Sequence, residues 1–498
     1  MALGDKTFKD QIYGSIDVKK AEVDLIQTKA FQRLRWLRQL GFVNYVFPCA
    51  EHSRFAHSLG VLHIMGRMSH KLNDLGFLPD HDVDRVRLAA LLHDIGHFPM
   101  SHLTESVYSA IEKQKANIEN VAGIEDDPYD KHPLVRFATL KTLRSVNHEE
   151  LGSLVVENYP EVRELVGDMA PLIGGIITGL TESNYLEHQL MHSSLDCDRQ
   201  DYLARDSHMT GAIYGRVDVD YLIGALGVGK THLANYRSVD LIGVYAKAQQ
   251  TLEHYLIARF FHFTRIIGNK TCRAFECLAK AVIYEMIRNH SGWPFKDFSE
   301  IKACLGERER SEEFLEFDDI NLWRCLREYS KTDQATNHYK TFLQMLRYRI
   351  RPKVILDFAC LRQTKDHHSA ADEEYVKLKF MLENGVDFLM EPLEISDPTH
   401  IGWQEMSVDI ERVDPGTGKS KEDEKDYDQY QIETPRIITR NGEALRLIDE
   451  KSSITMDLSQ TAYQSLIVYY VEPKADRSEL EKRCTNASKL ILTRIRSA

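Results

Sequence analysis

Residues 91–105 read LLHDIGHFPMSHLTE. In this stretch an apolar run ends at the adjacent pair His93-Asp94, and two further histidines, His97 and His102, follow it. The surrounding region is rich in histidine, because eight of the 21 histidines of the chain lie between residues 52 and 102. Histidine is the commonest metal ligand and titrates near neutral pH. We therefore expect a metal site or a proton-transfer group here, at the end of a helix.

The segments around this stretch are expected to be mainly helical. In residues 54–72 the apolar residues recur at three- and four-residue spacing, which is typical of an amphipathic helix. Residues 80–96 begin with aspartates that can cap a helix and continue as an apolar helix to Gly96, so His97 would share a face with His93. Further helices are expected at about 18–45, 142–159, 172–179, 192–211 and 240–290. The β-branched residues of 216–223 and 233–243 predict strands.

The composition also favours a mainly α-helical protein, in which the two predicted strands would form small β-hairpin elements. The 27 glycines and 14 prolines are together only about 8% of the 498 residues, below the usual share of about 12%. Beyond about residue 350 the pattern is mixed, which predicts a mixed α/β C-terminal region. Residues 414–429 carry many charges without apolar periodicity and are expected to form an exposed loop.

Charge and cysteine usage exclude several classes of function. The net charge of −12 argues against a general nucleic-acid-binding protein, whose surface would be basic. The eight cysteines are scattered without a CxxC pair, which fits free thiols in a reducing compartment. The chain starts without an apolar signal core and holds no uninterrupted apolar run of about 18 residues. We therefore expect a cytoplasmic protein without a membrane span.

Four residues of two chemical types form the candidate metal site. His57, His93, Asp94 and Asp198 offer two imidazoles and two carboxylates, a mixed set that suits Mn, Fe, Zn and similar ions and leaves positions open for water and substrate. Other residues near them have the chemistry for proton transfer or for holding phosphate. The candidates for proton transfer are His97, His102, Glu105, His148 and Glu149, and those for phosphate are Arg54, Arg199 and Arg259.

An extended match gives these residues a context. The segments FQRLRWLRQLGFVNYVFPCAEHSRFAHSLGV (31–61), LLHDIGHFPMSHLTE, NHEE (147–150) and LDCDRQDYLARD (195–206) occur in the order seen in the HD-domain phosphohydrolase superfamily. Within that superfamily the chain resembles the deoxynucleoside triphosphate triphosphohydrolases, which include the bacterial dGTPases. The resemblance covers roughly residues 5–285. It implies a helical catalytic core at 1–290 and a C-terminal oligomerisation or regulatory region at 291–498.

The resemblance also implies roles for individual residues. His57, His93, Asp94 and Asp198 match the metal ligands, and His102 matches the histidine that protonates the leaving 5′-oxygen. Glu105 stands where the family has an aspartate that pairs with this histidine. His97 and His148 match histidines near the α-phosphate, and Glu149 matches the acid that follows His148. Arg54, Arg199 and Arg259 match residues at the triphosphate. Tyr202 and Asp206 match residues near sugar and phosphate, and Gln39 and Leu40 match residues at the sugar.

Two departures from the family pattern concern specificity and regulation. Ile267 replaces a tyrosine that packs against the deoxyribose, which puts the exclusion of ribonucleotides in doubt. Gln27 replaces an aspartate that reads an activator guanine, although Lys6, Gln32 and Arg35 still match neighbouring positions of that allosteric site. The resemblance further implies a homo-oligomer, for which we expect a tetramer. Its nucleotide activator site between subunits either persists with a changed base preference or is lost.

A second motif competes with this interpretation. Residues 224–231, GALGVGKT, satisfy the P-loop pattern GxxxxGK[ST]. A P-loop requires a buried strand before it and a helix that starts at the lysine, here Lys230. The residues after Lys230 predict a strand and a turn instead, and glycines with positive φ in a hairpin turn would explain the pattern.

Three hypotheses for the function remain at this point. The first is hydrolysis of deoxynucleoside triphosphates to deoxynucleoside and inorganic triphosphate, with a divalent metal (Mn, Mg, Fe, Zn or Ni). The second keeps the HD site but acts on another nucleotide or phosphoester. The third is a nucleotide sensor or a binder of single-stranded nucleic acid, which the net charge and the complete ligand set disfavour.

Overall fold

The structure is a computed structural model that describes most of the chain. The described residues are 5–120, 133–135, 137, 146–179, 185–232, 238–289, 292–363, 370–409, 432–455, 461–472 and 477–497. They are mainly α-helical with three small sheets, as the sequence predicts. The predicted charged loop at 414–429 lies outside the described residues. Among the described helices, none has both the length and the apolar character that crossing a bilayer requires.

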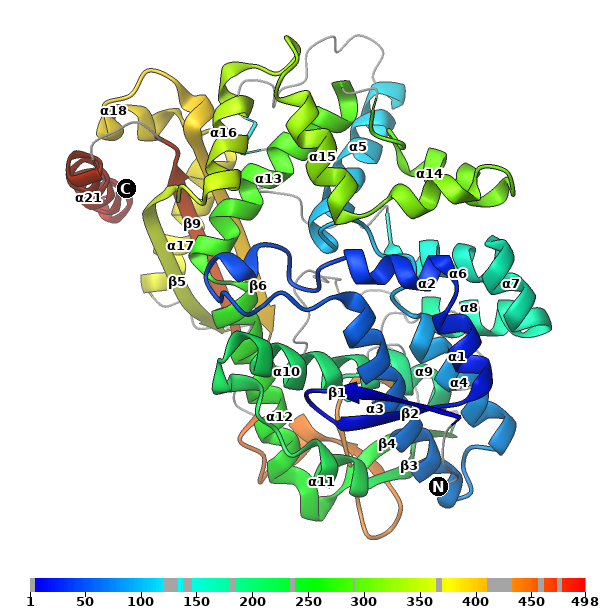
Figure 1. Cartoon of the computed structure of the whole chain (residues 1–498). Helices are drawn as coiled ribbons and strands as arrows, with labels where there is room; N and C mark the ends of the chain where they lie inside the picture. The colour runs from blue at the N-terminus through cyan, green and yellow to red at the C-terminus, as the bar shows by residue number, and fades with distance from the viewer. Residues whose placement is uncertain are drawn as a thin grey trace.

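A group of packed helices forms the centre of the molecule (Figure 1). Helix α3 packs against α4 and α10, while α8 packs against α4 and α6. Their bounds are α3 (Arg54–Asp74), α4 (Asp80–Leu92), α5 (His102–Asn120), α6 (His148–Asn158), α7 (Pro160–Val166), α8 (Ala170–Thr178), α9 (Tyr185–His192) and α10 (Cys197–Thr210).

Local sequence explains where two of these helices begin. Ser53 caps α3 by accepting a hydrogen bond from the Ala56 N–H at 3.5 Å, and Asp196 caps α10 by accepting one from the Arg199 N–H at 2.8 Å. Helix α4 differs from the prediction, because Pro79 precedes it and no aspartate side chain caps it. A capped start thus places His57 and Asp198 in the first turns of their helices.

Helix α4 ends at Leu92, four residues earlier than predicted, so His97 does not share a helical face with His93. The turn that follows α4 packs directly on the backbone of α6. A Cβ atom on Gly96 would lie 2.1 Å from the Gly152 N atom and 2.4 Å from the His148 carbonyl oxygen. Only glycine therefore permits this approach, which brings His148 beside His97.

The N-terminal segment also departs from the predicted single helix at 18–45. A hairpin of β1 (Lys6–Asp10) and β2 (Gly14–Val18) precedes α1 (Lys20–Ile26), α2 (Lys29–Gln32) and two 3-10 turns, η1 (Arg33–Trp36) and η2 (Gly41–Tyr45). Thr28 interrupts the helix because its hydroxyl accepts a hydrogen bond from the Phe31 N–H at 3.3 Å and starts α2 as a separate element.

The P-loop pattern lies in a β-sheet of order β3-β4-β7-β8. Residues 216–223, predicted as a strand, instead form most of α11 (Val219–Gly224), which Asp218 caps by accepting from the Tyr221 N–H at 2.9 Å. Lys230 lies within β3 (Leu226–His232) and pairs with Asp240 of β4 (Ser238–Tyr245), so no helix starts at the lysine. The sheet continues with β7 (Arg436–Ile438) and β8 (Ala444–Arg446).

The two glycines of this pattern that lie in β3 serve close packing and not the positive φ that we expected. Gly224, Gly227 and Gly229 have no positive φ angle. A Cβ on Gly227 would lie 2.8 Å from the Tyr245 ring, and one on Gly229 would lie 2.9 Å from the Ile438 side chain. The sheet therefore explains Gly227 and Gly229, whereas Gly224 is the last residue of α11 and has no described neighbour within 4 Å of a Cβ position.

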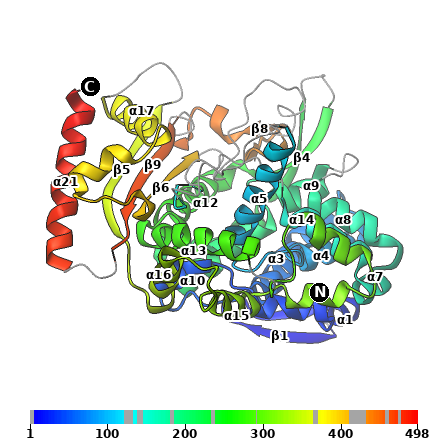
Figure 2. The same ribbon diagram turned by 90° about the horizontal axis from the view of Figure 1, so that it is seen from above.

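The C-terminal half adds helices to the core and a second sheet. In Figure 2, α21 and the sheet β5-β9-β6 lie at one side of the molecule, with α13 on the inner side of the sheet. Residues 293–346 share one hydrophobic core with α3 and α4, while α17 and α21 form a second core on the sheet. The bounds are α12 (Gln249–Phe261), η6 (His262–Ile267), α13 (Lys270–Asn289), α14 (Phe298–Gly306), η7 (Ser311–Glu316), α15 (Asp319–Tyr329), α16 (Asn337–Tyr348), β5 (Lys353–Gln363), α17 (Ala370–Glu383), α18 (Met390–Leu393), β6 (Ile401–Asp409), β9 (Thr461–Tyr470) and α21 (Arg477–Ser497).

Candidate active site

The four predicted metal ligands meet in one place. His57 comes from α3, His93 and Asp94 from the end of α4, and Asp198 from the first turn of α10. The His57 Nε2 atom lies 2.9 Å from Asp198 Oδ1 and 3.8 Å from Asp94 Oδ2. The His93 Nε2 atom lies 3.3 Å from Asp94 Oδ1 and 3.8 Å from Asp198 Oδ1. All four side chains therefore surround one small volume.

The orientation of the two imidazoles fits a metal ion in that volume. The Nδ1–H of His93 donates to the Ala90 carbonyl at 2.8 Å, and the Nδ1–H of His57 donates to Asp201 Oδ2 at 2.7 Å. Each ring thus turns its Nε2 lone pair inward. Both Nε2 atoms are buried and make no well-aligned hydrogen bond with any described residue. Buried polar atoms rarely lack partners, and imidazole nitrogens beside carboxylates are suitable ligands for a divalent ion.

Asp201 is a site residue that sequence reasoning missed. Its carboxylate is fully buried and accepts hydrogen bonds from His57, from Tyr13 Oη at 2.8 Å and from Arg205 at 2.9 and 3.0 Å. Arg205 also donates to Asp10 Oδ2 at 2.8 Å. A carboxylate behind a ligating histidine fixes the ring and raises its basicity. Asp201 follows Asp198 by three residues on the same helix, and this spacing, which places both carboxylates on one helical face, could have indicated it.

Electrostatics in this region favour a bound cation. Burial opposes a charged imidazole, but the Asp198 and Asp201 carboxylates raise the pKa of His57 to about 10. Burial likewise opposes ionisation of Asp94, but Arg54, His93 and His57 hold its pKa below the usual range. The site therefore carries carboxylate charge that protons or a metal ion must balance.

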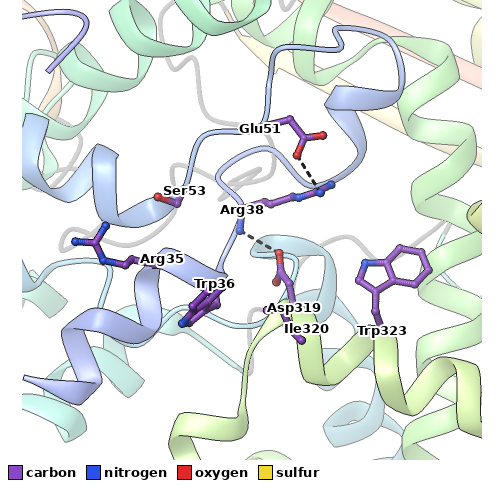
Figure 3. Close-up of a pocket in the computed structure, with 8 residues that line it drawn as sticks. All are labelled: Arg35, Trp36, Arg38, Glu51, Ser53, Asp319, Ile320 and Trp323. Atoms are coloured by element: carbon purple, nitrogen blue, oxygen red, sulfur yellow. Dashed lines mark hydrogen bonds and ion pairs between the residues drawn. The ribbon is translucent and has the colours of Figure 1, made fainter.

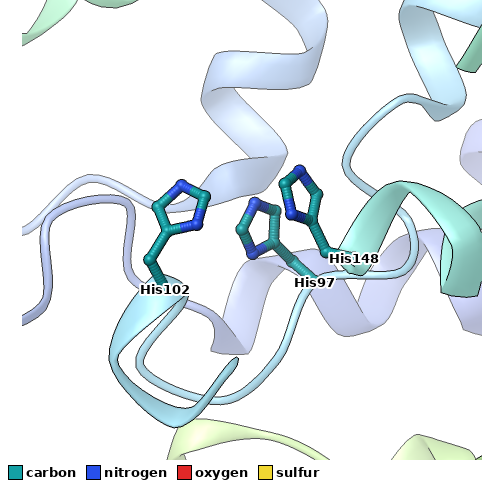
Figure 4. Close-up of side chains that lie close together, drawn as sticks. All are labelled: His97, His102 and His148. Atoms are coloured by element: carbon teal, nitrogen blue, oxygen red, sulfur yellow. The ribbon is translucent and has the colours of Figure 1, made fainter. Parts of the chain in front are cut away.

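Three further histidines form a second cluster beside the first (Figure 4). His97 comes from the turn after α4, His102 from the start of α5 and His148 from the start of α6. The His97 and His148 rings are stacked with centroids 3.9 Å apart, and the His102 ring lies 4.9 Å from His97. The His97 Nε2 atom lies 3.4 Å from Asp94 Oδ1, so the two clusters adjoin.

Glu105 organises this cluster. Its Oε2 atom accepts from His102 Nδ1 at 2.9 Å and from His148 Nδ1 at 3.2 Å. Although burial raises the pKa of Glu105, the two imidazoles lower it overall. Burial lowers the pKa of the half-buried His148, but Glu105 outweighs this effect and raises it. The His102 side chain is 63% exposed, in contrast to Glu105 at 8%. The Nδ1 atom of His102 is therefore hydrogen-bonded to a buried carboxylate, while most of the His102 side chain is exposed.

Comparison with known proteins finds a family match for the segment that carries the site. Residues 54–205 match the family model described as the HD domain. This segment is an HD domain. The match contains all four candidate ligands and the three histidines of the second cluster, while Tyr13 and Asp10 behind Asp201 lie outside it.

Relatives and solved structures resemble this chain over different lengths. An uncharacterized protein of Methanocaldococcus jannaschii is 28% identical over 332 residues, which cover 66% of this chain and 61% of that protein. The deoxynucleoside triphosphate triphosphohydrolase SAMHD1 of Homo sapiens is 29% identical over 218 residues, 41% of this chain and 33% of that enzyme. The chain thus spans at most about three fifths of these two relatives. A hypothetical protein of Aquifex aeolicus shares the fold with a TM-score of 0.62 and 21% identity, over 96% of this chain and 98% of that one.

The predicted phosphate-binding arginines are all held by protein oxygens near the candidate metal ligands. Arg54 donates from Nη1 to the candidate ligand Asp94 at 2.6 Å and from Nε to Ser101 Oγ at 2.8 Å. Arg199 donates to Asp196, and Arg259 donates to the Ser194 carbonyl at 2.7 Å. Arg54 is thus held by the candidate ligand Asp94, while Arg199 and Arg259 both donate to residues 193–196.

Asp206 is flanked by two histidines that the sequence reasoning did not assign to the site. His52 Nε2 and His262 Nε2 each donate to Asp206, both at 2.8 Å. Burial opposes its ionisation, but the two imidazoles hold the pKa of Asp206 below the usual range. The Tyr202 ring lies 5.2 Å from His262, which joins it to the group. His52 belongs to the histidine-rich region, whereas His262 gave no signal of its own.

The remaining predicted residues lie around these groups. Gln39 adjoins His52, because its N–H donates to the His52 carbonyl at 3.1 Å, and its Oε1 atom is buried without a partner among the described residues. Leu40 packs near Ile266, next to the half-buried Ile267 at the end of η6. In the first turn of α6, Glu149 accepts from Asn147 Nδ2 at 3.0 Å, a contact separate from the Glu105 hydrogen bonds.

The candidate allosteric residues lie on the N-terminal segment. Gln32 Oε1 accepts from Arg35 Nε at 2.7 Å, and the Arg35 guanidinium lies 3.6 Å from the centre of the Phe55 ring. Lys6 lies on β1 and Gln27 at the end of α1. The Lys6 Nζ atom lies 5.2 Å from the centre of the Phe8 ring on its own strand, whereas Gln32 and Arg35 bond to each other.

Proposed function

We propose that the protein is a metal-dependent phosphohydrolase that cleaves deoxynucleoside triphosphates to deoxynucleoside and inorganic triphosphate. The observation that carries the proposal is the adjacency of two groups: a His/His/Asp/Asp set whose two imidazole Nε2 atoms are buried with inward lone pairs, and an exposed histidine whose Nδ1 is hydrogen-bonded to a carboxylate. The resemblance to the triphosphohydrolases supports this substrate class.

The residues divide the proposed reaction between them. His57, His93, Asp94 and Asp198 would hold a divalent ion, which supplies Lewis-acid polarisation of the reacting phosphate. His102 would give a proton to the leaving O5′ atom, since it is open to the site and Glu105 fixes its Nδ1–H. His97 has a pKa well below its usual range because of burial and the nearby Arg54, so it stays neutral beside the phosphate.

Product analysis tests the proposal directly. The purified protein is incubated with Mn²⁺ and each dNTP and NTP, and the products are separated by chromatography. We expect deoxynucleoside and intact triphosphate, and no turnover by the metal-free double variant His93→Ala, Asp94→Ala. Stepwise release of orthophosphate, or full turnover by that variant, would refute the assignment.

A second substrate class follows from Ile267. An aliphatic side chain at this position offers no hydroxyl to a sugar, so we propose that ribonucleotides are the next substrates to examine. The NTP arm of the same assay decides between the two classes.

We further propose a homotetramer regulated by a second nucleotide, with Lys6, Gln32 and Arg35 at the activator site. Light scattering that shows a fully active monomer would refute it. The eight cysteines, all free of disulfides, support a reducing cytoplasmic location.

A further inference from the structure

A short turn connects the two halves of the active site. It runs from Phe98 to Ser101, between the metal-site end of α4 and His102 at the start of α5. Met100 and Ser101 have φ angles of 54° and 58°, although neither is glycine. Left-handed backbone at such residues is unfavourable and persists only where the surroundings impose it. The conformation of this turn sets the position of His102.

One carboxylate from a distant element holds the turn. Asp319, the first residue of α15, lies outside the segment matched by the HD domain. Its Oδ1 atom accepts from the Met100 N–H at 2.6 Å, and its Oδ2 atom accepts from the Arg38 N–H at 3.0 Å. Figure 3 draws the second of these hydrogen bonds at the edge of a pocket. Asp319 is buried, so water does not readily replace these contacts.

The hydrogen bonds continue from the turn to the metal site. Ser101 Oγ donates to the Arg38 carbonyl at 2.8 Å and accepts from Arg54 Nε at 2.8 Å. Arg54 then donates to the ligand Asp94 at 2.6 Å. Asp319 therefore fixes both the backbone before His102 and the serine that orients Arg54.

Arg33 makes a second connection of the same kind. Its guanidinium is buried and donates to the carbonyl oxygens of Ile95 and His97 at 2.9 Å each, and to the Phe317 carbonyl at 2.7 Å. The loop that carries the catalytic histidines is thus attached at two points to the segment Phe317–Asp319.

We infer that Asp319 is a positioning residue that places His102 against the metal site. The α15 segment thereby completes an active site whose ligands all lie within the HD domain. The inference rests on the proposed function only in giving His102 the role of acid; the attachment of the turn by Asp319 is independent of the substrate.

The test compares Asp319→Ala with a matched control on the same helix. Asp318 caps α15 by accepting from the Asn321 N–H at 2.8 Å, so Asp318→Ala weakens the helix start and leaves in place the acceptor of the Met100 and Arg38 N–H groups. Hydrogen exchange of residues 98–105 and 36–40, bound metal, kcat and KM are measured for both. Because misplacement by about 1 Å can cost about 100-fold in rate, we expect kcat of Asp319→Ala to fall about 10- to 100-fold. Exchange in both segments should rise, with metal content unchanged and KM within about two-fold.

Two further results keep the inference falsifiable. Asp319→Asn retains the shape and one acceptor, so its kcat and exchange should lie between those of the wild type and Asp319→Ala. Unchanged exchange in Asp319→Ala, or an equal loss of kcat in Asp318→Ala, would overturn the inference. If the wild type hydrolyses no dNTP, the proposed function fails, while the exchange data still decide whether Asp319 holds the turn.

Discussion

Replacement of Asp201 by Asn should weaken metal binding without removing a ligand. The Asp201 carboxylate accepts from His57 Nδ1 at 2.7 Å, and this hydrogen bond turns the His57 Nε2 atom toward Asp94 and Asp198. Asparagine keeps the shape but lacks the charge that makes the imidazole a stronger donor. Loss of such a supporting carboxylate typically costs 10- to 100-fold in metal affinity, which is about 1.4–2.8 kcal/mol.

The same change should also destabilise the metal-free protein. Asp201 shares Arg205 with Asp10, and breaking a buried pair costs about 3–5 kcal/mol when it leaves a charge uncompensated. Because Asp10 still pairs with Arg205 in the variant, we expect a loss at the lower end of that range. Gly60 adds a structural check, since a Cβ there would lie 1.9 Å from Asp201 Oδ1 and Gly60→Ala should disturb the same group.

Calorimetric titration with Mn²⁺ measures the first effect, and urea unfolding of the metal-free protein measures the second. Asp10→Asn is the matched control, because it removes the outer partner of Arg205 and leaves the His57 hydrogen bond intact. We expect its Mn²⁺ affinity to stay within about three-fold of the wild type. An unchanged affinity in Asp201→Asn, or an equal loss in Asp10→Asn, would refute the role assigned to Asp201.

Three other predictions follow from the site and the fold. His102→Ala should keep its metal and lose about 10²–10⁴ in kcat, Glu105→Ala should lose less, and the double variant should be little worse than His102→Ala, as steady-state kinetics will show. Lys230→Ala should hydrolyse substrate at the wild-type rate, because Lys230 lies within β3; a large loss would revive the P-loop hypothesis. Asp206 has a lowered pKa when folded, so it adds stability that is present above the unfolded pKa and lost as pH falls through the folded one. Urea unfolding should therefore show a shallower fall in stability from pH 6 to 3 in Asp206→Asn, and an unchanged slope would contradict this account.

Local signals together with the family resemblance predicted the candidate ligands, but not the groups that hold them. His93 and Asp94 are adjacent, and His57 and Asp198 lie in first turns whose caps, Ser53 and Asp196, are visible in the sequence. Each ligand is therefore defined by its own segment. The contact between Met100 and Asp319 joins residues 219 positions apart and leaves no local trace.

Two of the wrong secondary-structure predictions have a common physical cause. In residues 216–223 the β-branched side chains favour a strand, but the Asp218 cap and packing select α11. In residues 18–45 the helical pattern is real, but Thr28 divides it. Each time a single polar side chain that bonds to the backbone outweighs the summed propensity of its neighbours.

The balance of charge explains why carboxylates and arginines occur together around the candidate metal site. The connected group contains four carboxylates, those of Asp10, Asp94, Asp198 and Asp201, and two guanidiniums, those of Arg54 and Arg205. With neutral histidines the group carries four negative and two positive charges, a net charge of −2. Buried charge is costly unless it is compensated, and protonation of His57, whose pKa is raised to about 10, removes only part of the deficit. One divalent ion among the inward Nε2 atoms removes all of it and leaves both imidazoles neutral, which is the form in which histidine binds metal. The two arginines therefore do not take the place of the metal ion. They lower the negative charge of the carboxylates from four to two, and a divalent ion neutralises the remaining two.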